Sequence, residues 1–310
     1  MDPILQVDRL SISFTQYERG LRQRTLPVIR DLSLSLFPGQ VAAVVGSSGS
    51  GKSLLAHGIL GLLPYNSRME GTILYRGEPL TQRRTEALRG REMVLVPQGV
   101  TYLDPLMKVG PQVRKGRRDQ KSRDACRNVL ARYGLGPETE DLYPFELSGG
   151  MARRVFMASA VLEQPRLIVA DEPTPGLDAR AAGRILGHFR ELAEEGTAVL
   201  LITHDLELAL TIAHRVFVLY AGETVEEAAA ADFAAGGLRH PYTRALWNAL
   251  PQNGFTSIPG IQPYPGELAE GCQFAPRCPR CRPECRAGTL PTVPLRSGAV
   301  RCRFPEGGDI

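Results

Sequence analysis

The sequence contains no long apolar run. No stretch of its 310 residues reaches the roughly 18–20 consecutive apolar residues that a membrane-spanning helix needs. The first residues, Met1–Ile4, are not a basic region followed by an apolar stretch, so no signal peptide is predicted and the cytosol is the expected compartment. We therefore expect any membrane to be reached through a partner.

An excess of charge of one sign is also missing. The 37 basic and 33 acidic residues give a net charge of +4, which is too small to indicate a nucleic-acid-binding protein. The basic stretch Arg114–Arg123 has no interleaved aromatic residues that could stack on bases. We interpret it as a solvated helical face and expect no nucleic acid among the partners.

What the sequence does contain is a glycine-rich phosphate-binding pattern. Residues 46–53 read Gly-Ser-Ser-Gly-Ser-Gly-Lys-Ser, a P-loop, between the apolar run Val41–Val45 and the apolar helix Leu54–Leu60. Glycines let successive backbone N–H groups curl around a phosphate, Lys52 should reach the β- and γ-phosphates, and the Ser53 hydroxyl should ligate Mg²⁺. A glycine-rich turn is the alternative, which the strand–loop–helix context disfavours. The expected nucleotide contacts are Gly46, Ser47, Gly49, Ser50, Gly51, Lys52 and Ser53.

The first hundred residues also show strand periodicity. Apolar and polar residues alternate in Ile4–Phe14 and Leu32–Leu36, and Gly71–Gly77 resembles a third strand, which together predict a small antiparallel sheet. The polar stretch Tyr17–Pro27 between the first two is expected to be a hairpin loop. The short apolar strand Met93–Pro97 then leads to Gln98.

The remainder alternates between helix and strand. No strand pattern is visible from Gly99 to about Ala160, which predicts an inserted helical subdomain. Strand patterns at Leu167–Ala170, Ala198–Ile202 and Val216–Leu219 alternate with helices, so the predicted class is α/β with a mostly parallel sheet. The expected parts are residues 1–98 and 161–239 for a nucleotide-binding core, 99–160 for the helical subdomain and 240–310 for a cysteine-rich extension.

Two further polar patterns lie at the ends of regular elements. Asp171 and Glu172 end an apolar strand, where Mg²⁺ binding by Asp171 and activation of water by Glu172 are expected, with helix capping as the alternative. Ser148, Gly149 and Gly150 precede a helix. They fit an N-cap and equally a second phosphate site for a different nucleotide.

Taken in order, these motifs resemble those of ATP-binding cassette (ABC) ATPases over residues 1 to about 235. The resemblance implies that Gln98 contacts Mg²⁺ or the attacking water, and that His204, otherwise a strand-end histidine, senses the γ-phosphate. It also implies that the Ser148–Gly150 signature and Asp178 complete the site of a partner cassette. For adenine stacking, Phe14 is preferred over Tyr17.

The sequence departs from the usual ABC pattern at Met151 and Pro175. A Gly-Gly-Met signature is similar to that of the branch that powers oligopeptide, dipeptide and nickel importers, and the His240–Leu246 segment resembles the start of that branch's C-terminal extension.

Five of the six cysteines lie near the C-terminus, which in a cytosolic chain indicates metal rather than disulfides. Four of them match family cysteines that in some members hold a four-iron, four-sulfur (4Fe-4S) cluster. The alternatives are a Zn²⁺ site and free thiols that bind no metal. Cys281 is additional, and Cys126 is expected to be inert. The four matching residues are Cys272, Cys278, Cys285 and Cys302.

The resemblance implies an ATP- and Mg²⁺-dependent motor subunit at the cytoplasmic face of the inner membrane. The expected partners are a second ABC ATPase in a head-to-tail heterodimeric sandwich, two transmembrane permeases and, through them, an extracytoplasmic binding protein. The expected cargo is peptide or nickel, free or chelated. The alternative is a non-transport ABC ATPase, such as a phosphonate-metabolism accessory or a DNA-maintenance ATPase.

Overall fold

The computed structural model describes residues 2–19, 22–99, 102–295 and 297–306, and its contacts divide the chain into two compact units. Unit 1 comprises Met1–Phe37, Val41–Leu80 and Ile202–Ile310, and unit 2 comprises Pro38–Gln40 and Thr81–Leu201. Each unit is described by itself below. No helix among the described residues is both long and apolar enough to span a bilayer.

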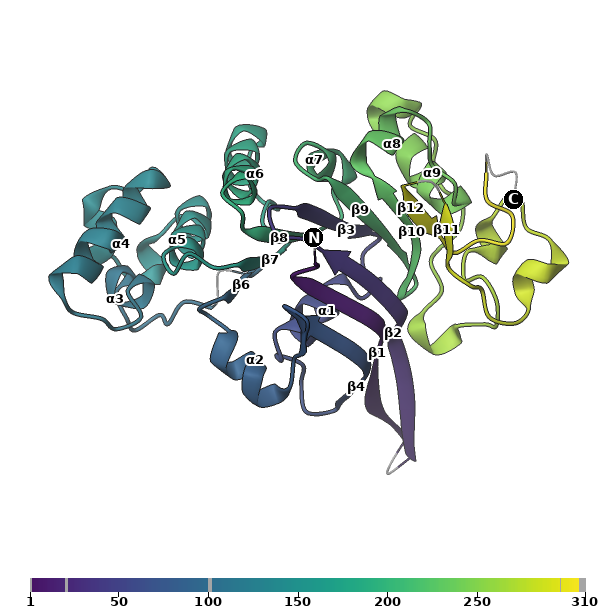
Figure 1. Cartoon of the computed structure of the whole chain (residues 1–310), viewed down its shortest axis with the longest axis horizontal. Coiled ribbons are helices and arrows are strands. Elements are labelled where there is room, and N and C mark those ends of the chain that lie inside the picture. The colour runs from purple at the N-terminus through teal and green to yellow at the C-terminus, as the bar shows by residue number, and fades with distance from the viewer. Residues whose placement is uncertain (1, 20–21, 100–101, 296, 307–310) are drawn as a thin grey trace. The chain divides into compact units, whose positions relative to one another are not determined.

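Unit 1 contains the predicted antiparallel sheet. Its strands lie in the order β2-β1-β4-β5 and are β1 (Leu5–Arg19), β2 (Arg22–Leu36), β4 (Ser67–Tyr75) and β5 (Glu78–Pro79) (Figure 1). The expected hairpin loop Tyr17–Pro27 is wrong, because both strands continue through most of it. The side chains of Arg22–Thr25 are all exposed, so the alternation that marks a half-buried strand is absent there.

A second group of strands in unit 1 lies in the order β11-β12-β10-β9-β3. Every residue of β3 is buried and β3 pairs in parallel with β9, which accounts for its continuous apolar sequence. The other pairings of this group are antiparallel. The strands are β3 (Val41–Gly46), β9 (Arg215–Tyr220), β10 (Glu223–Ala229), β11 (Val293–Leu295) and β12 (Gly298–Val300).

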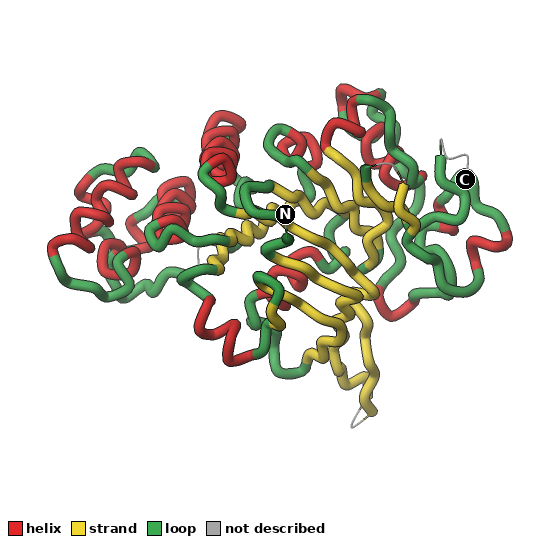
Figure 2. Tube along the Cα trace, viewed as in Figure 1, coloured by secondary structure: helices red, strands yellow, loops and turns green. Residues whose placement is uncertain are grey.

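The helices of unit 1 are short, and its C-terminal part is mostly loop (Figure 2). The α-helices are α1 (Lys52–Ile59), α7 (Leu206–Leu210), α8 (Ala230–Ala234) and α9 (Pro241–Asn248). Single 3₁₀ turns follow at Pro251–Asn253, Pro265–Glu267, Ala275–Arg277 and Pro283–Arg286.

Unit 2 contains a fully buried strand, with helices before and after it in the sequence. In this unit β7 (Leu167–Asp171) lies between β8 (Ala198–Thr203), whose last two residues belong to unit 1, and β6 (Met93–Val96). The helices are α2 (Gln82–Leu88), α3 (Val109–Val113), α4 (Gln120–Arg132), α5 (Gly149–Val161) and α6 (Ala179–Glu194), with 3₁₀ turns at Pro137–Asp141 and Pro144–Glu146. The α/β class predicted from the sequence is confirmed.

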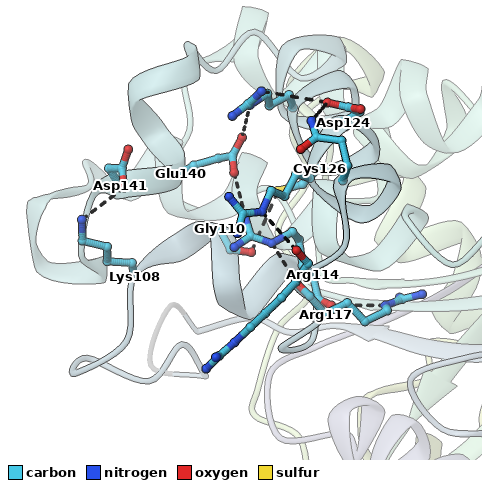
Figure 3. A network of polar contacts seen from close by, with 12 residues as sticks. Lys108, Gly110, Arg114, Arg117, Asp124, Cys126, Glu140 and Asp141 are labelled. Carbon is cyan, nitrogen blue, oxygen red and sulfur yellow. Dashed lines mark hydrogen bonds and ion pairs between the residues drawn. The ribbon is translucent and has the colours of Figure 1, made fainter.

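A polar network holds the helices of the predicted helical segment together (Figure 3). Arg114 Nη1 lies 2.8 Å from Glu140 Oε2, and both side chains are only 12% exposed. Arg127 Nε lies 3.1 Å from the other carboxylate oxygen. Arg114 is thus an exception to the solvated face expected for the basic stretch. Cys126 is buried beside the Gly110 carbonyl, and burial raises the pKa of its thiol to about 11.

Candidate functional site

The P-loop of unit 1 connects β3 to α1 through a backbone that requires glycine. A Cβ at Gly46 would lie 2.4 Å from the Leu219 carbonyl oxygen, and Gly51 has a φ of +92°. Lys52 Nζ donates to the carbonyl oxygens of Gly46 and Ser47, at 3.0 Å each. The lysine amine is thereby held against the curl of the loop, where it can meet a phosphate.

The aromatic candidates for adenine stacking point to opposite faces of β1. Side chains alternate along a strand, so Phe14 shares its face with Ile12 and Tyr17 does not. A Cβ at Gly58 of α1 would lie 3.2 Å from the Ile12 side chain, so this face turns toward the helix of the P-loop. Tyr17 is 64% exposed and its hydroxyl accepts from Gln23. Phe14 thus lies on the face of β1 toward α1, and Tyr17 lies on the opposite, exposed face.

His204, the remaining candidate in unit 1, directly follows β8 and is exposed. The chain around it is ordered by local hydrogen bonds, because Asp205 N donates to Thr203 Oγ1 at 3.0 Å and Asp205 caps α7 by accepting from Leu208 N at 2.9 Å. These bonds fix the turn that carries the imidazole.

Unit 2 presents two acidic residues at the end of β7. Asp171 and Glu172 are 4% and 6% exposed. Glu172 has a φ of 48°, an uncommon conformation for a residue with a side chain. Arg153 of α5 donates from Nη1 to the carbonyl oxygens of Glu172 and Pro173, at 3.3 and 3.0 Å. Arg153 therefore helps to hold the backbone of the proposed base, a role that the sequence analysis missed.

Gly150 of the signature and Asp178 line the same hollow of unit 2, which has a volume of about 730 Å³. Ser148 caps α5 by accepting from Met151 N at 3.2 Å, and Asp178 caps α6 by accepting from Ala181 N at 2.8 Å. Both residues are exposed. Both side chains therefore cap helices, as the alternative interpretation expects. Because both remain exposed, another molecule can still reach them.

The candidates for Mg²⁺ and water divide between the units. Gln98 follows β6 in unit 2 and is exposed. It belongs to the same unit as Asp171 and Glu172, whereas Lys52 and Ser53 belong to unit 1. Lys52 and Ser53 are therefore positioned by the fold of unit 1, and the other three residues by the fold of unit 2.

The cysteines of the extension separate into a group of four and a single residue. Burial raises the pKa of Cys272 to about 12, and nearby thiols add to the shift. One small cavity is lined by Cys272, Cys278, Cys285 and Cys302. Cys281 does not line this cavity, and its thiol instead donates to the Arg282 carbonyl oxygen at 3.6 Å. Among the described residues, no three His, Cys, Asp or Glu side chains are grouped closely enough to hold a single metal ion.

The fold and these motifs define a P-loop ATPase of the cassette type. The sequence matches the ABC transporter family over residues 29–175 and the oligopeptide/dipeptide transporter C-terminal region over residues 225–285. The chain belongs to the ABC transporter family. It is an ATPase that uses ATP and Mg²⁺ and is coupled to transport.

Curated relatives match nearly the whole chain. It is 35% identical to the dipeptide transport ATP-binding protein DppD of Escherichia coli (strain K12), with 97% of each chain covered. It is 34% identical to the oligopeptide transport ATP-binding protein OppD of Salmonella typhimurium, over 97% of this chain and 93% of that protein.

Solved structures agree with this assignment. The dimeric post-hydrolysis state of the ATP-binding cassette MJ0796, bound to ADP and Pi, has a TM-score of 0.63 at 26% identity and covers 73% of this chain and 98% of that one. The cbiO1 structure from Clostridium perfringens, described as part of the ABC transporter complex cbiONQ, has a TM-score of 0.63 at 25% identity and covers 82% and 98%.

Proposed function

We propose that this chain is the ATP-hydrolysing subunit of a binding-protein-dependent importer of oligopeptides or dipeptides. The observation that carries the proposal is the match of residues 225–285 to the oligopeptide/dipeptide transporter C-terminal region, in the same chain as the ABC match. The relatives described above are peptide transport proteins, which favours peptide over nickel as cargo. They also disfavour a non-transport ATPase in phosphonate metabolism or DNA maintenance.

The proposed hydrolysis assigns a role to each residue of the P-loop and the acidic strand end. Lys52 and the loop N–H groups hold the phosphates, and Glu172 accepts a proton from water as its oxygen attacks the γ-phosphorus. The bond from the γ-phosphorus to the bridging oxygen breaks, and ADP leaves with the electron pair. Bound Mg²⁺ supplies charge neutralisation, for which Ser53, Gln98 and Asp171 are the assigned ligands.

The remaining site residues are assigned to sensing and assembly. His204 contacts the γ-phosphate, and Phe14 stacks on adenine. The exposed signature residues Ser148, Gly149 and Gly150, with Asp178, complete the nucleotide site of a second cassette, which we propose is a different chain. Two permeases bind this pair at the cytoplasmic face of the inner membrane, and an extracytoplasmic binding protein delivers the cargo.

We assign a 4Fe-4S cluster to Cys272, Cys278, Cys285 and Cys302. Two observations support the fit. Cys272, Cys278, Cys285 and Cys302 line one small cavity, and four cysteine thiolates are the usual ligand set of such a cluster. His240 also lines the cavity, and its buried Nε2 has no partner among the described residues. Because Nδ1 accepts from Tyr242 N at 3.0 Å, Nε2 carries the proton and can donate to a sulfur.

The cluster assignment is tested by anaerobic purification. We expect about four iron and four sulfide per chain, and a Cys272→Ser variant should lose most of both. A matched Cys126→Ser variant should keep them. Purified protein without iron, or with iron that Cys272→Ser leaves unchanged, would contradict the assignment.

The importer proposal is tested by anaerobic pull-down of the tagged chain from its own membranes, with mass spectrometry of the partners. We expect two multispanning permeases and a sister ATPase. Recovery of only soluble metabolic or DNA-associated proteins would refute transport while leaving ATP hydrolysis intact.

A further inference from the structure

The C-terminal extension makes a direct contact with the P-loop. Ser47 Oγ donates to Gln262 Oε1 at 2.5 Å, between residues 215 positions apart in the sequence. Both side chains are half-buried. Both residues belong to unit 1, so this contact lies within one compact body.

A buried aromatic cluster holds the start of the extension. Tyr242 of α9 is 2% exposed, and its ring centroid lies 4.5 Å from that of Tyr220 and 5.3 Å from that of Phe274. Packing on two sides fixes the helix with which the extension begins.

The segment that carries Gln262 is anchored on both sides of that residue. Arg277 donates from Nε to the Pro259 carbonyl oxygen at 2.7 Å and from Nη2 to that of Ile258 at 3.1 Å. Beyond Gln262, the Arg24 guanidinium donates to the Gly266 carbonyl oxygen. The Gln262 amide is therefore presented to the P-loop by an ordered strap, residues 258–266.

We infer that Gln262 is a positioning residue for the P-loop, so that the C-terminal extension forms part of the nucleotide-binding site. The inference rests on ATP binding at this P-loop. The contact of Gln262 with Ser47 orders the loop before nucleotide arrives, which reduces the ordering cost of binding. Because P-loop N–H groups cradle the α- and β-phosphates, which ATP and ADP share, both nucleotides should benefit equally.

The test measures the Kd of MgATP and MgADP on the full chain by calorimetry. Loss of one hydrogen bond at a half-buried site should weaken the binding of both nucleotides about three- to tenfold in Gln262→Ala. At saturating ATP, kcat should change less than twofold. Gln252→Ala, at an exposed glutamine of the same extension, is the matched control and should bind as the unsubstituted chain does.

A double-mutant cycle separates positioning from general destabilisation. Ser47→Ala removes the partner of Gln262, so adding Gln262→Ala to it should weaken binding no further. Full additivity of the two substitutions, or unchanged Kd values in Gln262→Ala, would overturn the inference. Absence of MgATP binding by the unsubstituted chain would instead overturn the ATPase function itself.

Discussion

Glu172, the proposed general base, has a buried side chain and an uncommon backbone conformation. Its side chain is 6% exposed, and its backbone has a φ of 48°, which costs on the order of 1 kcal/mol or more and persists only when the surroundings hold it. The Arg153 guanidinium, bonded to the carbonyl oxygens of Glu172 and Pro173, is one such restraint. The neighbouring residues at the end of β7 therefore help to maintain this backbone conformation of Glu172.

We predict that Glu172→Gln lowers kcat for ATP hydrolysis by at least about 100-fold, because the amide cannot accept the proton of the attacking water. The Kd of MgATP should change less than about threefold, since the shape is kept. Phosphate release and calorimetry measure the two quantities. Glu194→Gln, at an exposed position of α6, is the control, and hydrolysis by Glu172→Gln at the normal rate would contradict the assignment.

Cys126 illustrates how burial decides reactivity at the level of one side chain. With the thiol pKa raised to about 11, about one molecule in a thousand carries the thiolate at pH 8. We predict that iodoacetamide modifies Cys126 of the folded chain only slowly at pH 8, that the rate rises about tenfold per pH unit toward pH 11, and that unfolding abolishes the protection. Mass spectrometry of the Cys126 peptide checks this; modification at equal rates in folded and unfolded protein would disprove it.

At the scale of elements, one ionic cluster ties the C-terminal extension to the antiparallel sheet. Arg301, just after β12, donates to the Asp31 carboxylate of β2 at 2.6 Å and to the Asp31 carbonyl oxygen at 3.0 Å. Its side chain is 9% exposed and also lies 3.9 Å from Glu223 of β10. One guanidinium thus joins strands from three segments of unit 1.

We predict that Arg301→Gln lowers the free energy of unfolding by about 3 kcal/mol, because it leaves the buried Glu223 carboxylate with fewer cationic partners. Burial already raises the pKa of Glu223, so the loss should grow as pH increases and the carboxylate ionises. Urea denaturation at pH 5 and pH 8 measures both effects. Arg303→Gln, at an exposed arginine two residues on, is the control; equal stability of the two variants would contradict the prediction.

The elements also show where sequence reasoning succeeds. The strands β3 and β7 are wholly buried, so their sequences are mostly continuous apolar runs. The P-loop and the acidic pair directly follow these runs, so the sequence alone locates them. The outer part of the β1–β2 hairpin was missed because its side chains are exposed on both faces. The local pattern therefore marks elements that are buried, and loses those that project into solvent.

The contacts of Ser47 with Gln262, and of Arg153 with Glu172, could not be found in the same way. They join residues that are 215 and 19 positions apart, and neither pair has a local pattern that names its partner. Gln262 lies in a stretch rich in proline and glycine, which predicts only a loop. Such contacts depend on tertiary packing, which a single sequence does not specify.

At the scale of the whole molecule, the signature is the part of the site that we assign to assembly with a second cassette. Gly149 lies at the exposed start of α5, where a Cβ would meet nothing within 4 Å. Open space at a helix N-terminus is what docking of a phosphate held by a second cassette requires.

Gly149→Glu tests this assembly without disturbing the isolated chain. A carboxylate in the first turn of a helix is favourable for that helix, and the space around Gly149 admits the side chain. In the assembled pair, however, it would face the partner's γ-phosphate. We therefore predict an unchanged Kd for MgATP on the isolated chain and at least tenfold slower hydrolysis by the reconstituted importer. Gly183→Glu, at an exposed and equally open position of α6, should leave both values intact. Normal hydrolysis by Gly149→Glu would mean that the signature does not meet nucleotide in the partner, and the sandwich assembly would have to be abandoned.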